Sequence, residues 1–186
     1  DEASSISDLN RLGFSENDCL VGITAGGTTP YVLSALDYAK SIGALNVLIT
    51  SVPEREVSFN FDIIIRLITG PELISGSTRL KAATATKMTL NIISTGVMVK
   101  LGKVYKNKMI DVSITNRKLL DRATRILVEL LDIDIEEALS LLDLSKGSTK
   151  KAILMKIGNL SYSAAVDVLA HNKGSLRRSL YNLEAK

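Results

Sequence analysis

The sequence predicts an α/β fold, a partial doubly wound parallel sheet, followed by a small all-helical bundle. Three short runs rich in Val, Ile and Leu alternate with helical patterns over the first half of the 186 residues. Strands that alternate with helices favour parallel pairing through right-handed crossovers. From Thr115 onward the periodic segments are all helical and the breaks between them are short, which is typical of a bundle. We therefore expect two domains, residues 1–113 and 114–186.

The first half of the chain divides into elements at its glycine and proline residues. A short helix is expected over residues 4–12, with Gly13 just past its end. Pro30 suits the first turn of a second helix, which Gly43 ends. Three apolar segments are short enough to be buried strands, and a long helix runs from about Thr78 to Leu101. The three predicted strands cover residues 18–24, 45–50 and 62–68. Such a sheet would keep an exposed edge.

The second half begins with residues 103–112, which we expect to be extended and irregular. An apolar stripe predicts a helix over residues 116–131. Asp134, Ser148 and Ser161 each precede a further helical pattern, as capping residues do. A final helix is expected over residues 176–183.

Two polar loops follow predicted strands, Ala25–Thr29 and Gly70–Thr78. In an open α/β sheet, ligands bind at the carboxyl ends of the strands, and we expect these two strands to be adjacent. Glycine and hydroxyl groups, with few carboxylates, suit an anionic ligand such as a sugar phosphate. The alternative is that Ser77 or Thr78 only caps the long helix. The candidate binding residues are Gly26, Gly27, Thr28, Thr29, Glu72, Ser75, Ser77, Thr78 and Lys81, with Gly76 and Arg79 beside them.

Glu72 and His171 are the residues whose chemistry has two interpretations. Glu72 could contact substrate or assist proton transfer, or it could be a carboxylate that the dipole at a helix N-terminus stabilises. His171 is the single histidine and lies at an expected helix end, where a plain C-terminal histidine is favoured over a general base. The single cysteine, Cys19, is expected to be a buried, inert thiol in a strand.

The run Gly70-Pro-Glu-x-Ile-x-Gly-Ser-Thr-Arg-Leu-Lys-Ala82 resembles the N-acetylmuramic acid 6-phosphate etherases, a branch of the sugar isomerase (SIS) superfamily. The similarity continues through residues 90–98, 101–105, 109–113 and 115–119, and upstream through Thr29-Pro-Tyr-Val32. The resemblance implies that residues 1–113 are the C-terminal part of a SIS domain. It also implies a cytoplasmic, homodimeric lyase that needs no cofactor and acts on a sugar phosphate in amino sugar catabolism.

The chain departs from this family in its first loop. Etherases typically read Ala-Ser-Gly-Arg-Thr-Pro-Tyr there, whereas Gly26 and Thr28 stand here in place of the serine and the arginine. The family's catalytic glutamates are expected upstream of Asp1, so that no catalytic residue is assigned in this chain and Glu72 is a weak candidate. The alternative function is a non-catalytic sugar-phosphate sensor that resembles glucokinase regulatory protein.

Composition argues against other classes of function. A net charge of +3 and 4% aromatic residues give little basis for nucleic-acid binding. No apolar run approaches the roughly 20 residues that span a bilayer. One histidine and one cysteine leave too few ligands for a zinc site. The predicted long helix is apolar over more than the stripe that one sheet can cover, and we therefore expect a homodimer that uses this helix.

Overall fold

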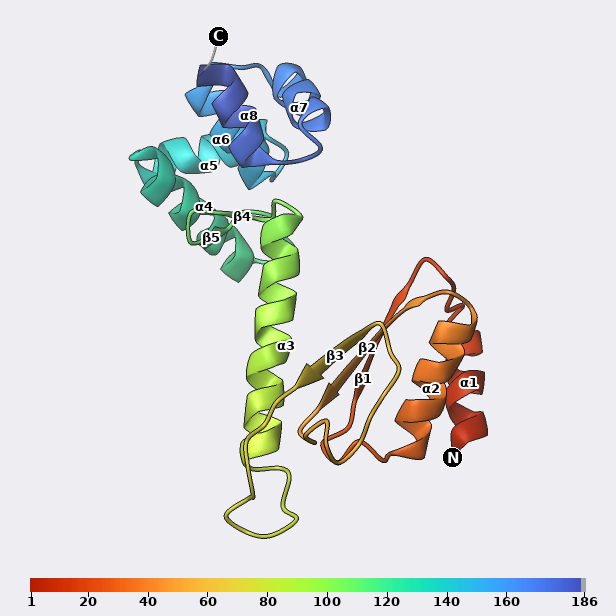
Figure 1. Cartoon of the computed structure of the whole chain (residues 1–186). Coiled ribbons are helices and arrows are strands. Elements are labelled where there is room, and N and C mark those ends of the chain that lie inside the picture. The colour runs from red at the N-terminus through yellow and green to blue at the C-terminus, as the bar shows by residue number, and fades with distance from the viewer. Residues whose placement is uncertain (185–186) are drawn as a thin grey trace. The chain divides into compact units, whose positions relative to one another are not determined.

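The computed structural model describes residues 1–184 and divides the chain into two compact units, residues 1–92 and from residue 93 onward (Figure 1). Helix α3 (Lys81–Lys100) contributes to both units. The α/β class is confirmed, with a three-stranded parallel sheet in the first unit and helices in the second. The assignment of residues 1–113 and 114–186 to separate domains stays a prediction.

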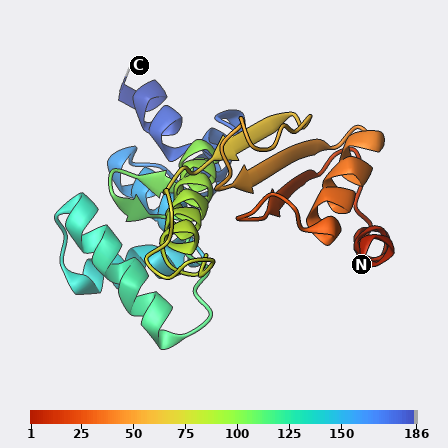
Figure 2. The ribbon, with the colours of Figure 1, turned by 60° about the horizontal axis from the view of Figure 1, so that its bottom comes forward.

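The first unit is built on strands β1 (Cys19–Ile23), β2 (Leu45–Thr50) and β3 (Ile63–Arg66), in the order β1-β2-β3. Helix α2 (Pro30–Ser41) packs on β1 and β2, and α1 (Glu2–Arg11) packs on α2. Figure 2 shows the same order, with α2 against the sheet and α1 beyond it. Only β2 has a partner strand on both sides, and its residues after Leu45 are all buried.

The burial predicted for the first and third strands is wrong. Alternate residues of β1 are exposed, including Val21 and Ile23, and Cys19 is exposed rather than buried. In β3, Ile63 is 45% exposed. Both strands lie at edges of the described sheet, and an edge strand is buried only where another element covers it. Apolar composition indicated the strands correctly but could not show which faces are covered.

A buried asparagine fixes the start of the β2–β3 pair. The Asn46 side-chain amide donates to the Asp62 carboxylate at 2.6 Å, and the Asn46 backbone N–H donates to the same oxygen at 3.1 Å. The Asp62 backbone N–H donates back to Asn46 Oδ1 at 2.9 Å. Asn46 is 1% exposed, so these bonds satisfy a polar group that would otherwise be costly to bury. They set the register in which Val47 lies opposite Ile63.

Helix α3 begins three residues later than the predicted start at Thr78 and ends one residue before Leu101. It is apolar on most of its circumference, and Ala82 is its one buried residue. Met88 is 56% exposed, Ile92 71% and Val99 52%. The helix therefore carries more apolar surface than the described chain covers.

The second unit is a bundle of short helices preceded by a small hairpin. Residues 103–112, predicted to be irregular, contain the two-residue strands β4 (Val104–Tyr105) and β5 (Lys108–Met109), whose turn places Lys106 in the left-handed region. Asp134, Ser148 and Ser161 cap their helices as predicted. The core includes the fully buried Leu127 and Ile153. The helices are α4 (Arg117–Leu131), α5 (Ile135–Leu144), α6 (Thr149–Ile157), α7 (Tyr162–His171) and α8 (Leu176–Glu184).

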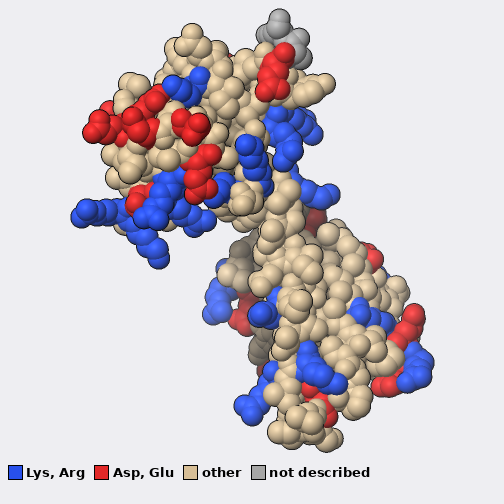
Figure 3. Space-filling view, turned by 90° about the vertical axis from the view of Figure 1, so that its left-hand side faces the viewer, with Lys and Arg blue, Asp and Glu red and all other residues tan. Residues whose placement is uncertain are grey.

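Two further properties of the described residues concern helix hydrophobicity and surface charge. No single helix is long and apolar enough to cross a membrane, and α6 and α7 reach that length and composition only as a pair bent by 107°. Lysine and arginine side chains are interspersed with aspartate and glutamate on the face drawn in Figure 3.

Candidate functional site

The two polar loops leave the same end of the sheet, but their strands are not neighbours. Residues 25–29 follow β1 and residues 70–78 follow β3, and β2 lies between them. The expectation that the two loops follow adjacent strands is therefore wrong. The loop that follows β2 therefore starts between the two polar loops. It holds the first of them, residues 25–29, in place.

The glycine loop, residues 25–29, is fixed by hydrogen bonds at its base. The Ser51 backbone N–H donates to the Ala25 carbonyl at 3.0 Å, and the Thr50 hydroxyl donates to the same oxygen at 3.3 Å. The hydroxyls of Thr24 and Thr29 lie 2.8 Å apart and share a hydrogen bond across the loop. The Thr29 hydroxyl therefore stabilises the loop itself.

Gly27 is the residue on which the shape of this loop depends. Its φ is +70°, in the left-handed region that residues with a side chain rarely adopt. A Cβ atom at this position would lie 2.7 Å from Cζ of Phe59. The backbone of the glycine loop therefore packs directly against an aromatic ring, which only glycine permits.

Arg66, the last residue of β3, holds Phe59 in place. Its guanidinium donates to the Val52 carbonyl at 2.7 Å and to the Val57 carbonyl at 2.9 Å. The same group lies 5.2 Å from the centre of the Phe59 ring, within the range of a cation–π contact. Arg66 and Phe59 together form a clamp that ties the loop after β2 to the glycine loop. No sequence pattern predicted this clamp, because it joins the end of a strand to Phe59 in a loop without a periodic pattern.

Glu72 caps helix α3. Its two carboxylate oxygens accept hydrogen bonds from the backbone N–H groups of Lys81 at 2.9 Å and Ala82 at 3.0 Å. These bonds, the one from Ala82 first, hold the pKa of the Glu72 carboxyl below its ordinary value, and the positive charge of Lys81 adds to the effect. The contacts are those of the dipole-stabilised carboxylate, one of the two interpretations open for this residue.

The hydroxyls of Ser77 and Thr78 do not cap the helix. Within residues 1–184 neither hydroxyl makes a hydrogen bond, while the backbone N–H of Ser77 donates to the Ile74 carbonyl. The alternative that one of them is the N-cap of α3 is therefore wrong, because Glu72 satisfies the first N–H groups of the helix. Both hydroxyls remain available to a ligand.

A cleft of about 510 Å³ lies between the end of β1 and the first three turns of α3. It brings Thr78 together with Ala25, the first residue of the glycine loop. The walls are mostly apolar, and two cations, Arg79 and Lys87, are among the lining residues. The lining residues are Ile23, Ala25, Thr78, Arg79, Ala82, Ala83, Thr86, Lys87, Leu90 and Asn91.

The other candidate residues lie outside this lining. Ser77 directly precedes Thr78 in the chain, Gly26 and Ser75 are exposed, and Thr28 lines a different groove, of about 590 Å³, beside α1 and α2. Lys87 and Thr86 were missed by sequence analysis. The available signal was helical spacing, since residues 79, 83, 87 and 90 fall on one face of a helix that starts near Thr78.

The cleft has no carboxylate or histidine of its own. None of its lining residues is an aspartate, a glutamate or a histidine. No group of three or more metal-binding side chains occurs within residues 1–184. The site can bind and orient a ligand, but its lining offers no carboxylate or imidazole for proton transfer.

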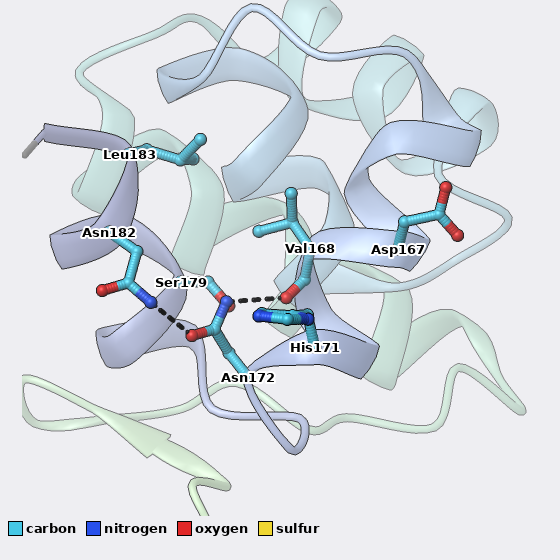
Figure 4. Close-up of a pocket in the computed structure, with 7 residues that line it drawn as sticks. All are labelled: Asp167, Val168, His171, Asn172, Ser179, Asn182 and Leu183. Carbon is cyan, nitrogen blue, oxygen red and sulfur yellow. Dashed lines mark hydrogen bonds between the residues drawn. The ribbon is translucent and has the colours of Figure 1, made fainter. Parts of the chain in front are cut away.

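A second cavity, of about 560 Å³, lies between α7 and α8 in the helical unit (Figure 4). The Asn182 amide donates to Asn172 Oδ1 at 2.7 Å, and the Asn172 amide donates to the Val168 carbonyl at 2.8 Å. His171 is at the end of α7, as expected, and lines this cavity with Asp167. The Asn172 side chain thus both accepts a hydrogen bond and donates one within the protein.

Comparison with known proteins identifies the relatives of this chain. It is 61% identical over 96% of its length to the N-acetylmuramic acid 6-phosphate etherase of a strain of Prochlorococcus marinus. It is 57% identical to the protein of the same name from Synechococcus sp. (strain CC9902), again over 96% of the chain. Over the part that it spans, the chain is homologous to the N-acetylmuramic acid 6-phosphate etherases. No protein-family model matches it.

The chain spans little more than half the length of these etherases. The match covers 58% of the Prochlorococcus protein and 57% of the Synechococcus protein. The etherase of Parasynechococcus marenigrum (strain WH8102) is 54% identical, and the match covers 56% of its length. The resemblance read from residues 70–82 is thus confirmed at the level of the family.

Proposed function

We propose that this chain forms the sugar-phosphate-binding part of an N-acetylmuramic acid 6-phosphate etherase. Such an enzyme is a carbon–oxygen lyase that cleaves the D-lactyl ether, giving N-acetylglucosamine 6-phosphate and D-lactate. The observation that carries the proposal is the cleft at the end of β1, where the free hydroxyl of Thr78 and the Arg79 cation come together beside apolar walls. The names of the relatives supply the identity of the sugar.

The phosphate is assigned to Ser77, Thr78 and Arg79. The backbone N–H groups of Lys81 and Ala82 at the start of α3 are occupied by Glu72, so an anion cannot use them as it would at a free helix N-terminus. The Thr78 hydroxyl and the guanidinium are the remaining donors at that end of the cleft, and the Ser77 hydroxyl is the next along the chain. Hydrogen bonds from such groups to a phosphate are charge-assisted and therefore strong.

Cleavage requires a carboxylate that removes the proton beside the sugar carbonyl and an acid that helps the lactyl group to leave. The lining of the cleft contains no carboxyl group for either role. We assign these roles to glutamates outside this chain, in the part that the longer relatives contain. The 186-residue chain by itself is then expected to bind the sugar phosphate and to release no lactate above a buffer control.

The rest of the proposal concerns the domain, the cellular location and the oligomeric state. Residues 1–113 would be the C-terminal part of a SIS domain, in a cytoplasmic enzyme of amino sugar catabolism. The exposed apolar residues of α3 support a homodimer through this helix, because a helix apolar beyond one stripe needs a second surface. The same loops would also serve a non-catalytic sugar-phosphate sensor, an alternative that Gly26, Thr28 and the carboxylate-free cleft favour. Lactate release by a full-length protein would exclude this sensor.

The binding role is tested by removing the two free hydroxyls. Ser77→Ala combined with Thr78→Ala is expected to weaken the binding of N-acetylglucosamine 6-phosphate by about 2–3 kcal/mol in isothermal titration. Thermal stability should not change, because neither hydroxyl caps α3. Thr84→Ala is the matched control, since its hydroxyl bonds to the Leu80 carbonyl and lies outside the cleft. Unchanged affinity in the double variant would contradict the assignment.

A further inference from the structure

Lys87 lies apart from the groups assigned to the phosphate. It is the seventh residue of α3, so that its Cα lies about 9 Å along the axis from that of Lys81, at a rise of about 1.5 Å per residue. Arg79 precedes the helix, and both cations line the same cleft. The cleft therefore presents two positive charges that are separated along its length.

Neither cation has an ion-pair partner within residues 1–184. In the helical unit, by contrast, lysines form ion pairs: Lys103 lies 2.8 Å from Asp111, Lys108 pairs with Glu129, and Lys156 lies 2.5 Å from Glu137. Around Lys87 the lining is Ala83 and Leu90 on its own helix, with Ile23 opposite on β1. Lys87 is exposed, so its ammonium group is accessible to an anion that enters the cleft.

We propose that Lys87 binds the lactyl carboxylate of the substrate and so distinguishes it from the product sugar. This inference rests on the proposed function. N-acetylmuramic acid 6-phosphate carries a carboxylate on the C3 ether and a phosphate on C6, two anions that leave the ring from different carbons. With the phosphate at Ser77, Thr78 and Arg79, the remaining cation of the cleft is the one placed to meet the second anion.

The proposal makes Lys87 a specificity-determining residue. N-acetylglucosamine 6-phosphate has the same phosphate and the same N-acetyl group, but a hydroxyl where the substrate has its lactyl ether. Lys87 would therefore contribute to the affinity for the substrate and hardly at all to the affinity for the product. Loss of the carboxylate on cleavage would release the product sugar from this contact.

The test compares two ligands that differ only in the lactyl group. N-acetylmuramic acid 6-phosphate and N-acetylglucosamine 6-phosphate are titrated in parallel into the 186-residue chain and into three variants. Lys87→Met should weaken the first ligand roughly tenfold, as expected for one partly solvated charge-assisted contact, and the second less than twofold. Lys87→Arg keeps the charge and should recover most of the affinity. Lys100→Met, on the same helix but outside the cleft, should change neither ligand.

Each other result overturns the assignment. An equal loss for both ligands would place Lys87 on the part that they share, or would reveal a general effect on the fold, which circular dichroism of the variant separates. No loss for either ligand would show that Lys87 makes no contact. If the wild-type chain bound both sugars with equal affinity, the role of Lys87 would be refuted. The proposed sugar-phosphate site would be unaffected by that result. A folded chain that binds neither ligand would refute the proposed function itself.

Discussion

Gly27 gives the sharpest test of the structure of the glycine loop, because its neighbour Gly26 is a matched control. Gly27→Ala places a side chain at a φ of +70°, which costs roughly 1–2 kcal/mol for an L-residue. The new Cβ would also lie 2.7 Å from Cζ of Phe59, and overpacking of this kind costs about 1–3 kcal/mol. We expect the substitution to lower the free energy of unfolding by about 2–5 kcal/mol.

The steric part of this cost depends on whether Phe59 can move away. Its ring stacks on Phe61 at a centroid distance of 6.1 Å and lies beneath the Arg66 guanidinium, which is itself bound to two carbonyls. The ring is therefore held from two sides. Shortening it, in the double variant Gly27→Ala/Phe59→Leu, should recover part of the steric cost but none of the cost of the left-handed backbone.

Gly26→Ala isolates the two effects. A Cβ at Gly26 would meet only the Thr28 hydroxyl, at 3.8 Å, and its φ lies outside the left-handed region. We expect a change within about 0.5 kcal/mol, as for most surface substitutions. Urea unfolding followed by circular dichroism measures both variants. Equal stability of the two would refute the account of the loop.

Three further predictions concern the clamp, the helix cap and the exposed helix. Arg66→Ala should destabilise the first unit by about 1.5–3 kcal/mol through loss of two charge-assisted hydrogen bonds, and should speed hydrogen exchange in residues 52–59; unchanged exchange there would contradict the clamp. Because the folded-state pKa of Glu72 is depressed, its stabilising effect is complete well above the ordinary value of 4.5 and is lost as the pH falls through the lower, folded value. Glu72→Gln should therefore be less stable than the wild type at pH 7 and should approach it in acid, and a constant difference between pH 7 and pH 3 in thermal melts would refute this. Met98→Glu should shift the mass seen by light scattering at tens of micromolar from a dimer to a monomer, whereas a wild-type mass near the chain's 20.1 kDa would refute the dimer.

Much of the fold could be predicted because its signals are local. Asp134, Ser148 and Ser161 cap helices with side chains that reach only three residues along the chain, a distance over which sequence patterns are informative. Burial of the strands could not be predicted in the same way, since the exposure of Cys19 and Ile63 depends on which elements cover the edges of the sheet.

The candidate site could be predicted only in part, because some of its contacts are local in the sequence and others are not. Ser77 and Thr78 stand where a ligand loop places its hydroxyls, but their capping role was wrong because the cap comes from Glu72, nine residues before Lys81. The Arg66–Phe59 clamp joins a strand end to a loop, and no period or motif connects the two residues. Lys87 became a candidate only when the structure placed it in the same cleft as Thr78.

The central claim is that a sugar phosphate binds in the cleft between β1 and α3, and mapping of backbone amide shifts tests it most directly. N-acetylmuramic acid 6-phosphate is titrated into the ¹⁵N-labelled chain, and the amide resonances are followed to saturation. The account predicts saturable shifts in residues 25–29 and 77–91, with little change at Asn172 and Asn182 in the cavity of the helical unit. Shifts confined to that second cavity, or no saturable shifts in a folded chain, would contradict it.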